Sequence, residues 1–251
     1  MVLRTEDELK DIFGKVKNLL TAHREMGLDP PPISSKALNY LETKISNKRQ
    51  AASSQPVSLE SLEKLREHIG DCRRCRLFEG RKQLVFGEGS PRARLVFVAE
   101  GPGRDEDLAG RPFVGEAGKL LTSIIENGMG LSRKDVYICN VVKCRPPGNR
   151  DPKKDEIKAC IPFLKQQLKI ISPEVICVLG RIAGQALLGS DLKISKDRGK
   201  WQSYMDIPVM PTFHPAYILR NPSRERQLKG QVWKDIQEIM SRLGLEVKKN
   251  G

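Results

Sequence analysis

The stretch Leu95-Val-Phe-Val-Ala-Glu-Gly-Pro-Gly103-Arg-Asp-Glu-Asp-Leu-Ala-Gly110-Arg-Pro-Phe-Val-Gly115 decides the fold of this chain. The apolar residues from 93 to 99 predict a short strand that is buried on both faces. A helical pattern begins at Ala117, and the segment between is too long and too acidic for a plain turn. Open α/β sheets place their ligand sites at the carboxyl ends of such strands, so we expect a binding site here.

Further strands and helices alternate along the rest of the chain. Buried strands are predicted at 136–142, 175–179 and 209–213, and helices at 58–72, 117–127, 153–170, 181–188 and 232–243. This alternation predicts a parallel sheet with helices on both faces, an α/β/α sandwich. Residues 1–57 read as an extension with an amphipathic helix, Leu9 to Leu20, and a polar linker, so the main domain is predicted to span 58–251.

The net charge and the absence of membrane signals limit the possible partners. The chain carries a net charge of +13 with a pI near 9.6, and residues 61–251 hold 35 Lys and Arg against 23 Asp and Glu. Such a surplus indicates a polyanionic partner, either nucleic acid or a membrane surface. No apolar run approaches the roughly 20 residues of a membrane span, and no signal peptide is recognisable. We therefore expect a cytoplasmic monomer.

Four of the six cysteines have the spacing of a metal or cluster site. Cys72 and Cys75 form a C-x2-C pair, Cys144 lies in a Pro-rich turn, and Cys160 lies in a predicted helix. Four thiolates hold either tetrahedral zinc or a 4Fe-4S cluster, and the spacing alone does not choose between them. The other two cysteines, at 139 and 177, lie in apolar strands and are expected to be small buried side chains.

Polar residues follow two further strands. His214 comes directly after the last strand, and Asn140 is the odd polar residue in the strand 136–142. Both are expected at the same sheet edge as Phe113. Taken alone, His214 also suits a packed loop residue, and Asn140 also suits a structural tie to the backbone. A buried amide needs hydrogen-bond partners, and a ligand can be one of them.

Several of these motifs together resemble the family 4 uracil-DNA glycosylases. The match covers residues 59 to 243 in six blocks that agree in order and spacing: Cys72-x2-Cys75; Glu100-Gly-Pro-Gly103 with Glu106-Asp107; Gly110-Arg-Pro-Phe113-Val-Gly115; Asn140-Val-Val-Lys-Cys144; Cys160; and His214-Pro-x-x-x-Leu219-Arg220. The resemblance implies a four-stranded parallel sheet between helices. It also implies a 4Fe-4S cluster on the four cysteines instead of zinc, and excision of uracil from single- or double-stranded DNA.

The chemistry of base excision suggests a role for each pocket residue. Phe113 is expected to stack on the flipped base, and Asn140 to select uracil, because its amide donates to O4 and accepts from N3–H. His214 is expected to stabilise the charge that develops on uracil O2. Backbone N–H groups at Glu100 and Gly101 are expected to assist His214.

The attacking water and the DNA also need partners. Glu106 is the predicted residue for positioning the water, with Asp105 and Asp107 as alternates, although an acidic run also suits helix capping. Leu219 is expected to wedge into the vacated base stack, unless it packs in the core, and Arg220 to hold a phosphate.

The resemblance has limits. Ala99 stands where the family usually has Gly. Residues 1–57 have no counterpart in the family, and this extension is a candidate site for a protein partner. The segment from Cys144 to Cys160 lacks the inserted His-containing loop of relatives that trap DNA covalently. Two alternatives stay open: a non-catalytic iron-sulfur module that binds DNA or recruits a partner, and a glycosylase for another deaminated base such as hypoxanthine.

Overall fold

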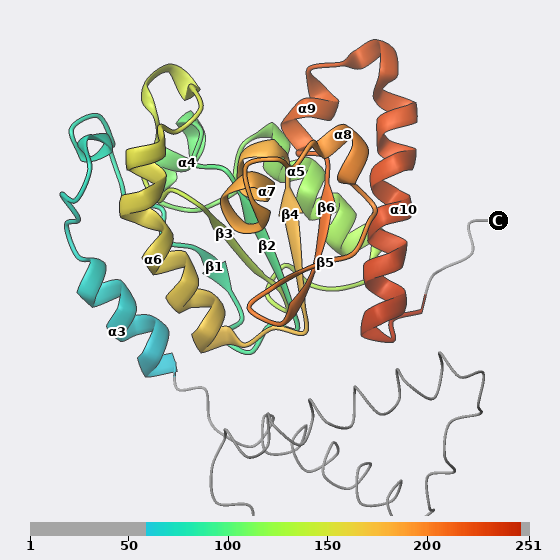
Figure 1. The fold of residues 1–251 in the computed structure, drawn as a ribbon, viewed down its shortest axis with the longest axis horizontal. Helices are drawn as coiled ribbons and strands as arrows, with labels where there is room; N and C mark the ends of the chain where they lie inside the picture. Colours follow the sequence, from blue (N-terminus) through green and yellow to red (C-terminus); the bar gives the residue numbers. More distant parts are fainter. Residues whose placement is uncertain (1–58, 247–251) are drawn as a thin grey trace, which may run out of the picture. The chain divides into compact units, whose positions relative to one another are not determined.

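A six-stranded sheet forms the centre of the part of the chain that this computed structural model describes, residues 59–246 (Figure 1). Its strand order is β1-β3-β2-β4-β6-β5. The four central strands run parallel, as the alternation of strands and helices predicted. Their bounds are Leu95–Ala99 for β2, Tyr137–Asn140 for β3, Val175–Leu179 for β4 and Ile207–Thr212 for β6.

The four predicted parallel strands are all present, but each edge of the sheet carries one further strand that was not predicted. β1 (Glu88–Gly89) pairs antiparallel with β3, and β5 (Gln202–Tyr204) pairs antiparallel with β6. Neither strand has the apolar run of a buried strand, since both lie at an edge. The β5–β6 hairpin turns at Met205 and Asp206, whose φ angles are 53° and 63°. Such turns usually carry Asn-Gly or Asp-Gly, so this hairpin lacks its common signal.

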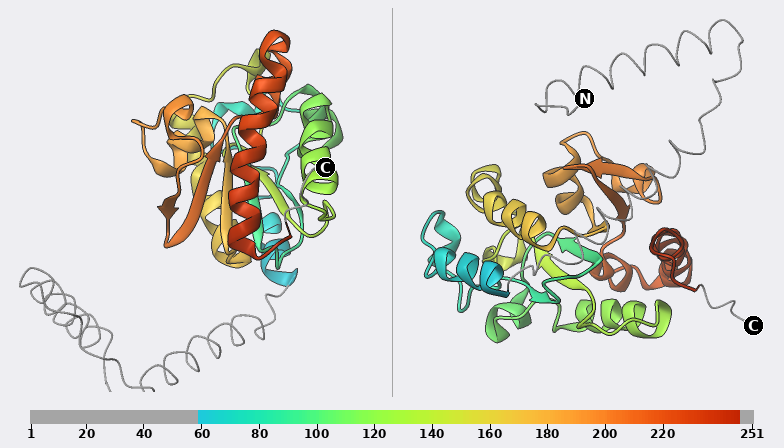
Figure 2. Two further views of the ribbon diagram at one scale, coloured as in Figure 1. Left: turned by 90° about the vertical axis from the view of Figure 1, so that its right-hand side faces the viewer. Right: turned by 90° about the horizontal axis from the view of Figure 1, so that it is seen from below.

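Helices cover both faces of the sheet (Figure 2). One face packs against α3 (Leu59–Ile69), α6 (Lys154–Ile171) and α7 (Arg181–Leu188). The other packs against α5 (Glu116–Ser123), α9 (Pro215–Leu219) and α10 (Glu225–Leu243). Strand β2 shows why: Val96 and Val98 enter the first core, whereas Leu95, Phe97 and Ala99 enter the second. Successive side chains of a strand point to opposite faces, so a strand between two helical layers is apolar throughout.

The long helices lie close to where the hydrophobic periodicity predicted them. Two differ at one end. α5 stops at Ser123, and a π-helical turn, η2 (Ile124–Gly128), continues it, whereas α10 begins at Glu225, before the predicted start at 232. Three short helices were not predicted: α4 (Arg104–Ala109), α8 (Ile194–Asp197) and α9. Each has at most six residues, too few for a helical period to show in the sequence.

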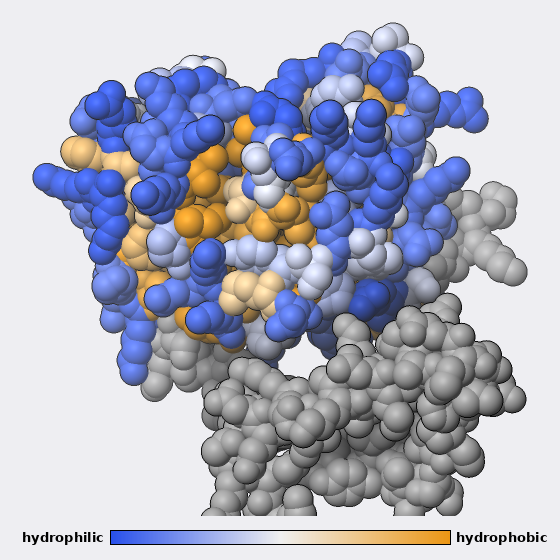
Figure 3. Space-filling model, viewed as in Figure 1, coloured by the Kyte–Doolittle hydropathy of each residue, from blue (hydrophilic) through white to orange (hydrophobic). Residues whose placement is uncertain are grey.

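The surface and the limits of the domain complete the description. Hydrophilic residues cover most of the face in Figure 3 and surround an apolar area between α6 and α10. Within residues 59–246, no helix combines the length and the apolar character needed to cross a bilayer. All these residues belong to one unit whose boundary falls between Pro56 and Val57. The predicted extension 1–57, with its amphipathic helix, lies outside the described residues.

Candidate active site

A cavity of about 460 Å³ opens at the carboxyl ends of the parallel strands. Each of the four parallel strands leads to a residue that lines the cavity: Glu100 follows β2, Asn140 ends β3, Leu179 ends β4 and His214 follows β6. Segments that are far apart in the sequence therefore meet at one place, the usual ligand site of an open α/β sheet. The cavity is also lined by other residues that the sequence singled out, namely Gly101, Glu106, Phe113 and Arg220.

Asn140 lines this cavity with an unused hydrogen-bond acceptor. The residue is 2% exposed, and its side-chain oxygen Oδ1 has no partner within the described structure. The backbone around it is fixed, because Asn140 lies beside Ala99 in the parallel ladder and Val141 N–H donates to the Ala99 carbonyl over 2.8 Å. Leaving a buried acceptor unpaired is costly, so this oxygen indicates a ligand that donates a hydrogen bond.

His214 is held in one tautomer. It is the N-cap of α9, and its Nδ1 accepts the N–H of Ala216 over 3.0 Å. A ring nitrogen that accepts this bond carries no proton, so in the neutral imidazole the proton lies on Nε2. Burial and, to a lesser degree, the positive charge of Arg220 lower the pKa of His214 to about 4. At neutral pH the site therefore presents a neutral N–H donor.

Phe113 occupies a strained backbone position at the cavity. Its φ angle is 54°, which is unusual for an aromatic residue, and its side chain is buried. The backbone can reach this position because residue 118 is glycine: a Cβ there would lie 2.0 Å from the Phe113 carbonyl oxygen. The Phe113 ring stacks on His214 with centroids 5.5 Å apart. A base between the two rings would need about 7 Å, so it must use the other face of Phe113.

Glu106, the residue predicted to position water, lines the cavity but is bound to the backbone on both sides. Oε2 accepts the N–H of Gly103 over 3.1 Å, and Oε1 accepts those of Val114 and Gly115, each over 2.9 Å. These bonds tie the start of α4 to the chain beyond Phe113. The contacts of Glu106 thus favour the capping alternative, a structural support of the loop.

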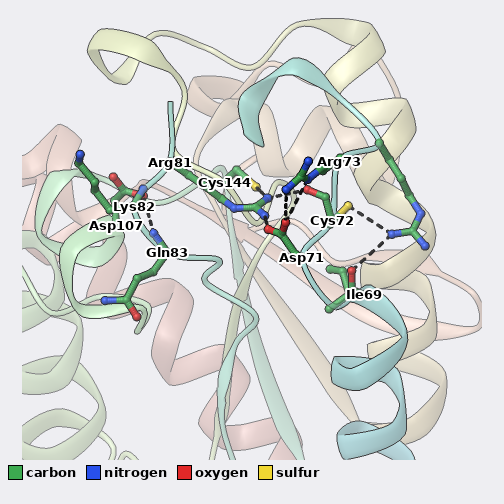
Figure 4. A network of polar contacts seen from close by, with 10 residues as sticks. Ile69, Asp71, Cys72, Arg73, Arg81, Lys82, Gln83, Asp107 and Cys144 are labelled. Atoms are coloured by element: carbon green, nitrogen blue, oxygen red, sulfur yellow. Dashed lines mark hydrogen bonds and ion pairs between the residues drawn. The ribbon is translucent and has the colours of Figure 1, made fainter. Parts of the chain in front are cut away.

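The two alternates to Glu106 lie elsewhere. Asp107 is buried, and its Oδ1 accepts the backbone N–H groups of Lys82 and Gln83 over 2.9 and 3.4 Å (Figure 4). It therefore joins α4 to the segment that follows the first cysteine pair. Asp105 is exposed and does not line the cavity. Neither carboxylate faces the cavity that Asn140 and His214 line.

Glu100 is the carboxyl group in the cavity with the most perturbed proton affinity. Burial raises its pKa to about 7, with a further contribution from Asp151, while Arg181 and Arg220 act in the opposite direction. Sequence reasoning missed Asp151 and Arg181, which form an ion pair of 2.5 Å at the cavity rim. The position of Arg181 in the sequence could have revealed it. Arg181 follows the end of β4, the one parallel strand for which no polar site residue had been predicted.

Leu219 and Arg220 lie at the end of α9. Leu219 is 41% exposed, so it is not a core residue, and Arg220 is exposed beside the cavity. The helix thus begins at the imidazole and ends at an apolar side chain that solvent surrounds. An exposed leucine next to an arginine is suited to enter a base stack while the guanidinium holds a phosphate.

The four candidate ligand cysteines gather at one end of α3 and α6. Cys144 and Cys160 are buried, Cys72 and Cys75 are half-buried, and all four belong to or pack against the same core. Burial raises the pKa of the Cys75 thiol, and Cys72 raises it further. Burial also raises the pKa of the Cys160 thiol, with smaller contributions from Cys144 and Cys75. Within residues 59–246, no three Cys, His, Asp or Glu side chains converge tightly enough for a single metal ion.

Hydrogen-bond donors already point at the sulfurs. Arg81 donates to Cys144 Sγ over 3.1 Å and to the Cys72 carbonyl over 2.7 Å, and it pairs with Asp71 at 2.6 Å (Figure 4). Arg74 donates to Cys72 Sγ over 3.3 Å. N–H donors directed at sulfur stabilise thiolates, so this donor set fits an anionic cluster bound by four cysteines. Cys139 and Cys177 are fully buried in β3 and β4, as predicted.

Comparison with known proteins agrees with this geometry. The model of the uracil DNA glycosylase superfamily matches residues 86–237, which include every cavity residue described above. This chain belongs to that superfamily. Its membership places the chain among the DNA glycosylases, which hydrolyse N-glycosyl bonds. The match ends before residue 243 and begins after the first cysteine pair, so it does not by itself speak to Cys72 and Cys75.

Relatives within the superfamily extend the match to the cysteine segment. The type-4 uracil-DNA glycosylase of Sulfurisphaera tokodaii is 47% identical over 189 residues, which is 72% of this chain and 86% of the relative. That of Thermotoga maritima is also 47% identical, over 72% of this chain and 94% of the relative. A type-5 uracil-DNA glycosylase, from Thermus thermophilus, is 34% identical over 41% of this chain and 53% of the relative.

Proposed function

We propose that this glycosylase flips uracil out of DNA into the cavity and hydrolyses its N-glycosidic bond, the first step of base excision repair. The observation that carries this proposal is the unpartnered Oδ1 of Asn140, buried at the end of β3. Uracil offers N3–H to such an oxygen, and the Asn140 amide can donate to O4. Cytosine presents an acceptor at N3 and a donor at its amino group, so it matches neither. A site left with unpaired polar groups rejects the wrong base.

His214 acts as a neutral electrophile in this proposal. Cleavage of the glycosidic bond leaves negative charge on uracil O2, and the Nε2–H of His214 donates to it. Such a donor contributes about 3 kcal/mol to transition-state stabilisation by analogy with oxyanion holes. The bond from Ala216 N–H to Nδ1 keeps the proton on the outer nitrogen, so no rearrangement is needed when charge develops.

Glu100 is our candidate for orienting the attacking water. It lines the cavity, and its pKa of about 7 leaves a substantial ionised fraction at neutral pH. A carboxylate there would also favour the positive charge that forms on the sugar. Glu106 instead holds the loop through its three backbone bonds, so it positions Phe113 for stacking on the base.

The DNA contacts and the cluster complete the proposal. Leu219 fills the gap left by the flipped nucleotide, and Arg220 binds a neighbouring phosphate. Cys72, Cys75, Cys144 and Cys160 hold a 4Fe-4S cluster, which fixes the cysteine segments against the sheet when bound. The identity to type-4 enzymes and the arginine donors at Cys72 and Cys144 support this assignment.

An oligonucleotide assay tests the function. The purified full chain is incubated with DNA containing U·G, U·A, hypoxanthine or T·G, without added metal or ATP, and free base is measured. We expect uracil release, its loss in His214→Ala, and retained DNA binding by that variant. Binding without base release would favour the iron-sulfur recruitment module, and release of hypoxanthine alone would favour the other glycosylase.

A further inference from the structure

Lys143 lies between the cavity and the cysteine site with no exposed surface. A fully buried ammonium is rare in proteins because removing its hydration is costly, so its partners must compensate. In the sequence, Lys143 lies three residues after Asn140 and directly before Cys144. The mechanism proposed above does not use it. Its surroundings therefore need an explanation of their own.

The ammonium binds the backbone of the base-recognition residue. Lys143 Nζ donates to the Asn140 carbonyl over 2.8 Å and to Gln167 Oε1 over 2.6 Å. Gln167 in α6 is itself buried, and its Nε2 donates to the Phe86 carbonyl and to the Tyr137 hydroxyl. These linked hydrogen bonds fix the backbone at the end of β3. The Asn140 side chain meanwhile faces the cavity with its Oδ1 unpartnered.

Lys143 also touches the cysteine site. Its backbone N–H donates to Cys160 Sγ over 3.3 Å. Burial lowers the pKa of Lys143, while the neighbouring Cys139 and Cys160 act in the opposite direction. Within residues 59–246, no carboxylate forms an ion pair with Lys143. Neutral thiols do not balance a buried positive charge, whereas thiolates that hold a cluster would. The cation thus suits an anionic group at the cysteines.

We propose that Lys143 is a positioning residue that links the cysteine site to uracil recognition: it holds the Asn140 backbone so that the amide faces the base, and its charge balances the cysteine-bound cluster. This inference rests on the proposed function of Asn140 and on the cluster assignment. Outer-shell partners of this kind typically change affinity or activity 10- to 100-fold when removed. We expect an effect of about this size on base discrimination.

A binding experiment without catalysis tests the first part of the proposal, that Lys143 supports the recognition of uracil by Asn140. Duplexes containing 2′-fluoro-deoxyuridine or 2′-fluoro-deoxycytidine, whose glycosidic bonds resist cleavage, are titrated against the full-length protein carrying its iron. Lys143→Met removes the charge and both bonds, and Lys143→Gln keeps a neutral donor. We expect the preference for uracil over cytosine to fall about 10- to 100-fold in Lys143→Met and less in Lys143→Gln.

A double-mutant cycle distinguishes positioning from general loss of structure. If Lys143 acts through Asn140, the double variant Lys143→Met/Asn140→Ala should discriminate no worse than Asn140→Ala alone. Effects that multiply, or a Lys143→Met protein with wild-type preference, would overturn the proposal. Should Lys143→Met not fold, as judged by circular dichroism, the same cycle with Lys143→Gln decides.

The reduction potential of the cluster tests the second part of the proposal, that the charge of Lys143 balances the cluster. Loss of a nearby positive charge favours the oxidised cluster, so the potential should become more negative in both Lys143 variants. An unchanged potential would contradict the charge role. Iron content is measured alongside it, to show that the cluster is present in each protein.

Thr212→Val serves as the matched control. Thr212 is equally buried in the sheet, but its hydroxyl bonds Asp235 over 2.6 Å, on the other face from the cysteines. This variant should lower the thermal midpoint without changing discrimination or potential. If the wild-type protein itself shows no preference for uracil, the proposed function fails. If wild type and Asn140→Ala behave as expected while both Lys143 variants resemble wild type, only the Lys143 inference fails.

Discussion

At the scale of single residues, two cavity groups have pKa values displaced in opposite directions by burial. The pKa of His214 falls to about 4 and that of Glu100 rises to about 7. Burial disfavours the charged form of each, so the imidazole stays neutral and the carboxyl group holds its proton longer. Both displacements can be checked through the pH dependence of the reaction.

His214→Ala should lower kcat/KM for uracil release about 10²- to 10³-fold at pH 7, the usual cost of one oxyanion donor. Affinity for DNA should change little, because the loss concerns the transition state. Wild-type His214 has a folded pKa below its unfolded value of 6.5, so its contribution to stability is present above pH 6.5 and is lost as the pH falls toward 4. Single-turnover kinetics and acid unfolding measure the two effects. An alanine variant with the wild-type rate would contradict the donor role.

Glu100→Gln should remove a pH-dependent limb from the rate profile. If ionised Glu100 orients the water, wild-type kcat/KM rises as the pH increases through about 7, and the variant is slower and flat across this range. Stability changes in the opposite sense: a folded pKa above the unfolded 4.5 stabilises the protein below pH 4.5, and this contribution disappears as the pH rises through 7. A glutamine variant that keeps the limb would assign it to another group.

At the scale of elements, the loop from 100 to 115 depends on one carboxylate. Glu106 accepts three backbone N–H groups and so joins the start of α4 to the residues after Phe113. The strained φ of Phe113 persists because this frame and Gly118 hold it. The loop that looked like a solvated acidic run is thus an ordered support for the stacking ring.

Glu106→Ala should lower the free energy of unfolding by about 2 kcal/mol, since hydrogen bonds to a charged group are lost. It should also reduce kcat/KM, because Phe113 loses its support. Asp105→Ala is the matched control: Asp105 is exposed in the same helix and lies outside the cavity. Urea unfolding and base release compare the two. Equal stability of both variants would remove the structural role of Glu106.

The sequence predicted the long helices, which show a helical periodicity of apolar residues, and the buried strands, which are continuous apolar runs. Strand β4 and helix α7 begin and end where expected, because apolar runs and helical stripes are written directly in the chain. The six-residue α4 and the hairpin at Met205 were missed, since tertiary contacts and not local propensity stabilise them. The proximity of Asn140 and His214 could be predicted, because both follow or end parallel strands. The hydrogen bonds of Glu106 and Lys143 could not be predicted from the sequence, because they depend on the folded loop.

At the scale of the whole molecule, the cysteine site connects segments that the sheet alone does not hold. Cys72 and Cys75 follow α3, Cys144 follows β3, and Cys160 lies in α6. Arg81 bonds to Cys144 and Cys72, and the neighbouring residues 82 and 83 bond to Asp107 in α4. These bonds therefore connect the cysteine segment to α4, beside the cavity.

Cys72→Ala should lose iron and its broad visible absorption and should melt at a lower temperature than wild type. The segment from 70 to 83 loses its anchor, so local unfolding is expected instead of a small change in rate. Cys177→Ala, which alters a buried cysteine outside the site, should keep its iron. Metal analysis and thermal melts make the comparison. A colourless Cys72→Ala protein with full stability and activity would refute the cluster's structural role.

The five-residue helix α9 has a consequence for the order of events on DNA. His214 caps its start and Leu219 is its last residue, so about 7.5 Å of rigid backbone separates the imidazole from the apolar wedge. The two cannot move independently. If Leu219 and His214 have the roles proposed for them, a nucleotide that remains stacked would keep Leu219 outside the duplex and the imidazole away from uracil O2. With the roles proposed for His214 and Leu219, bond cleavage would thus be coupled to the departure of the base from the helix.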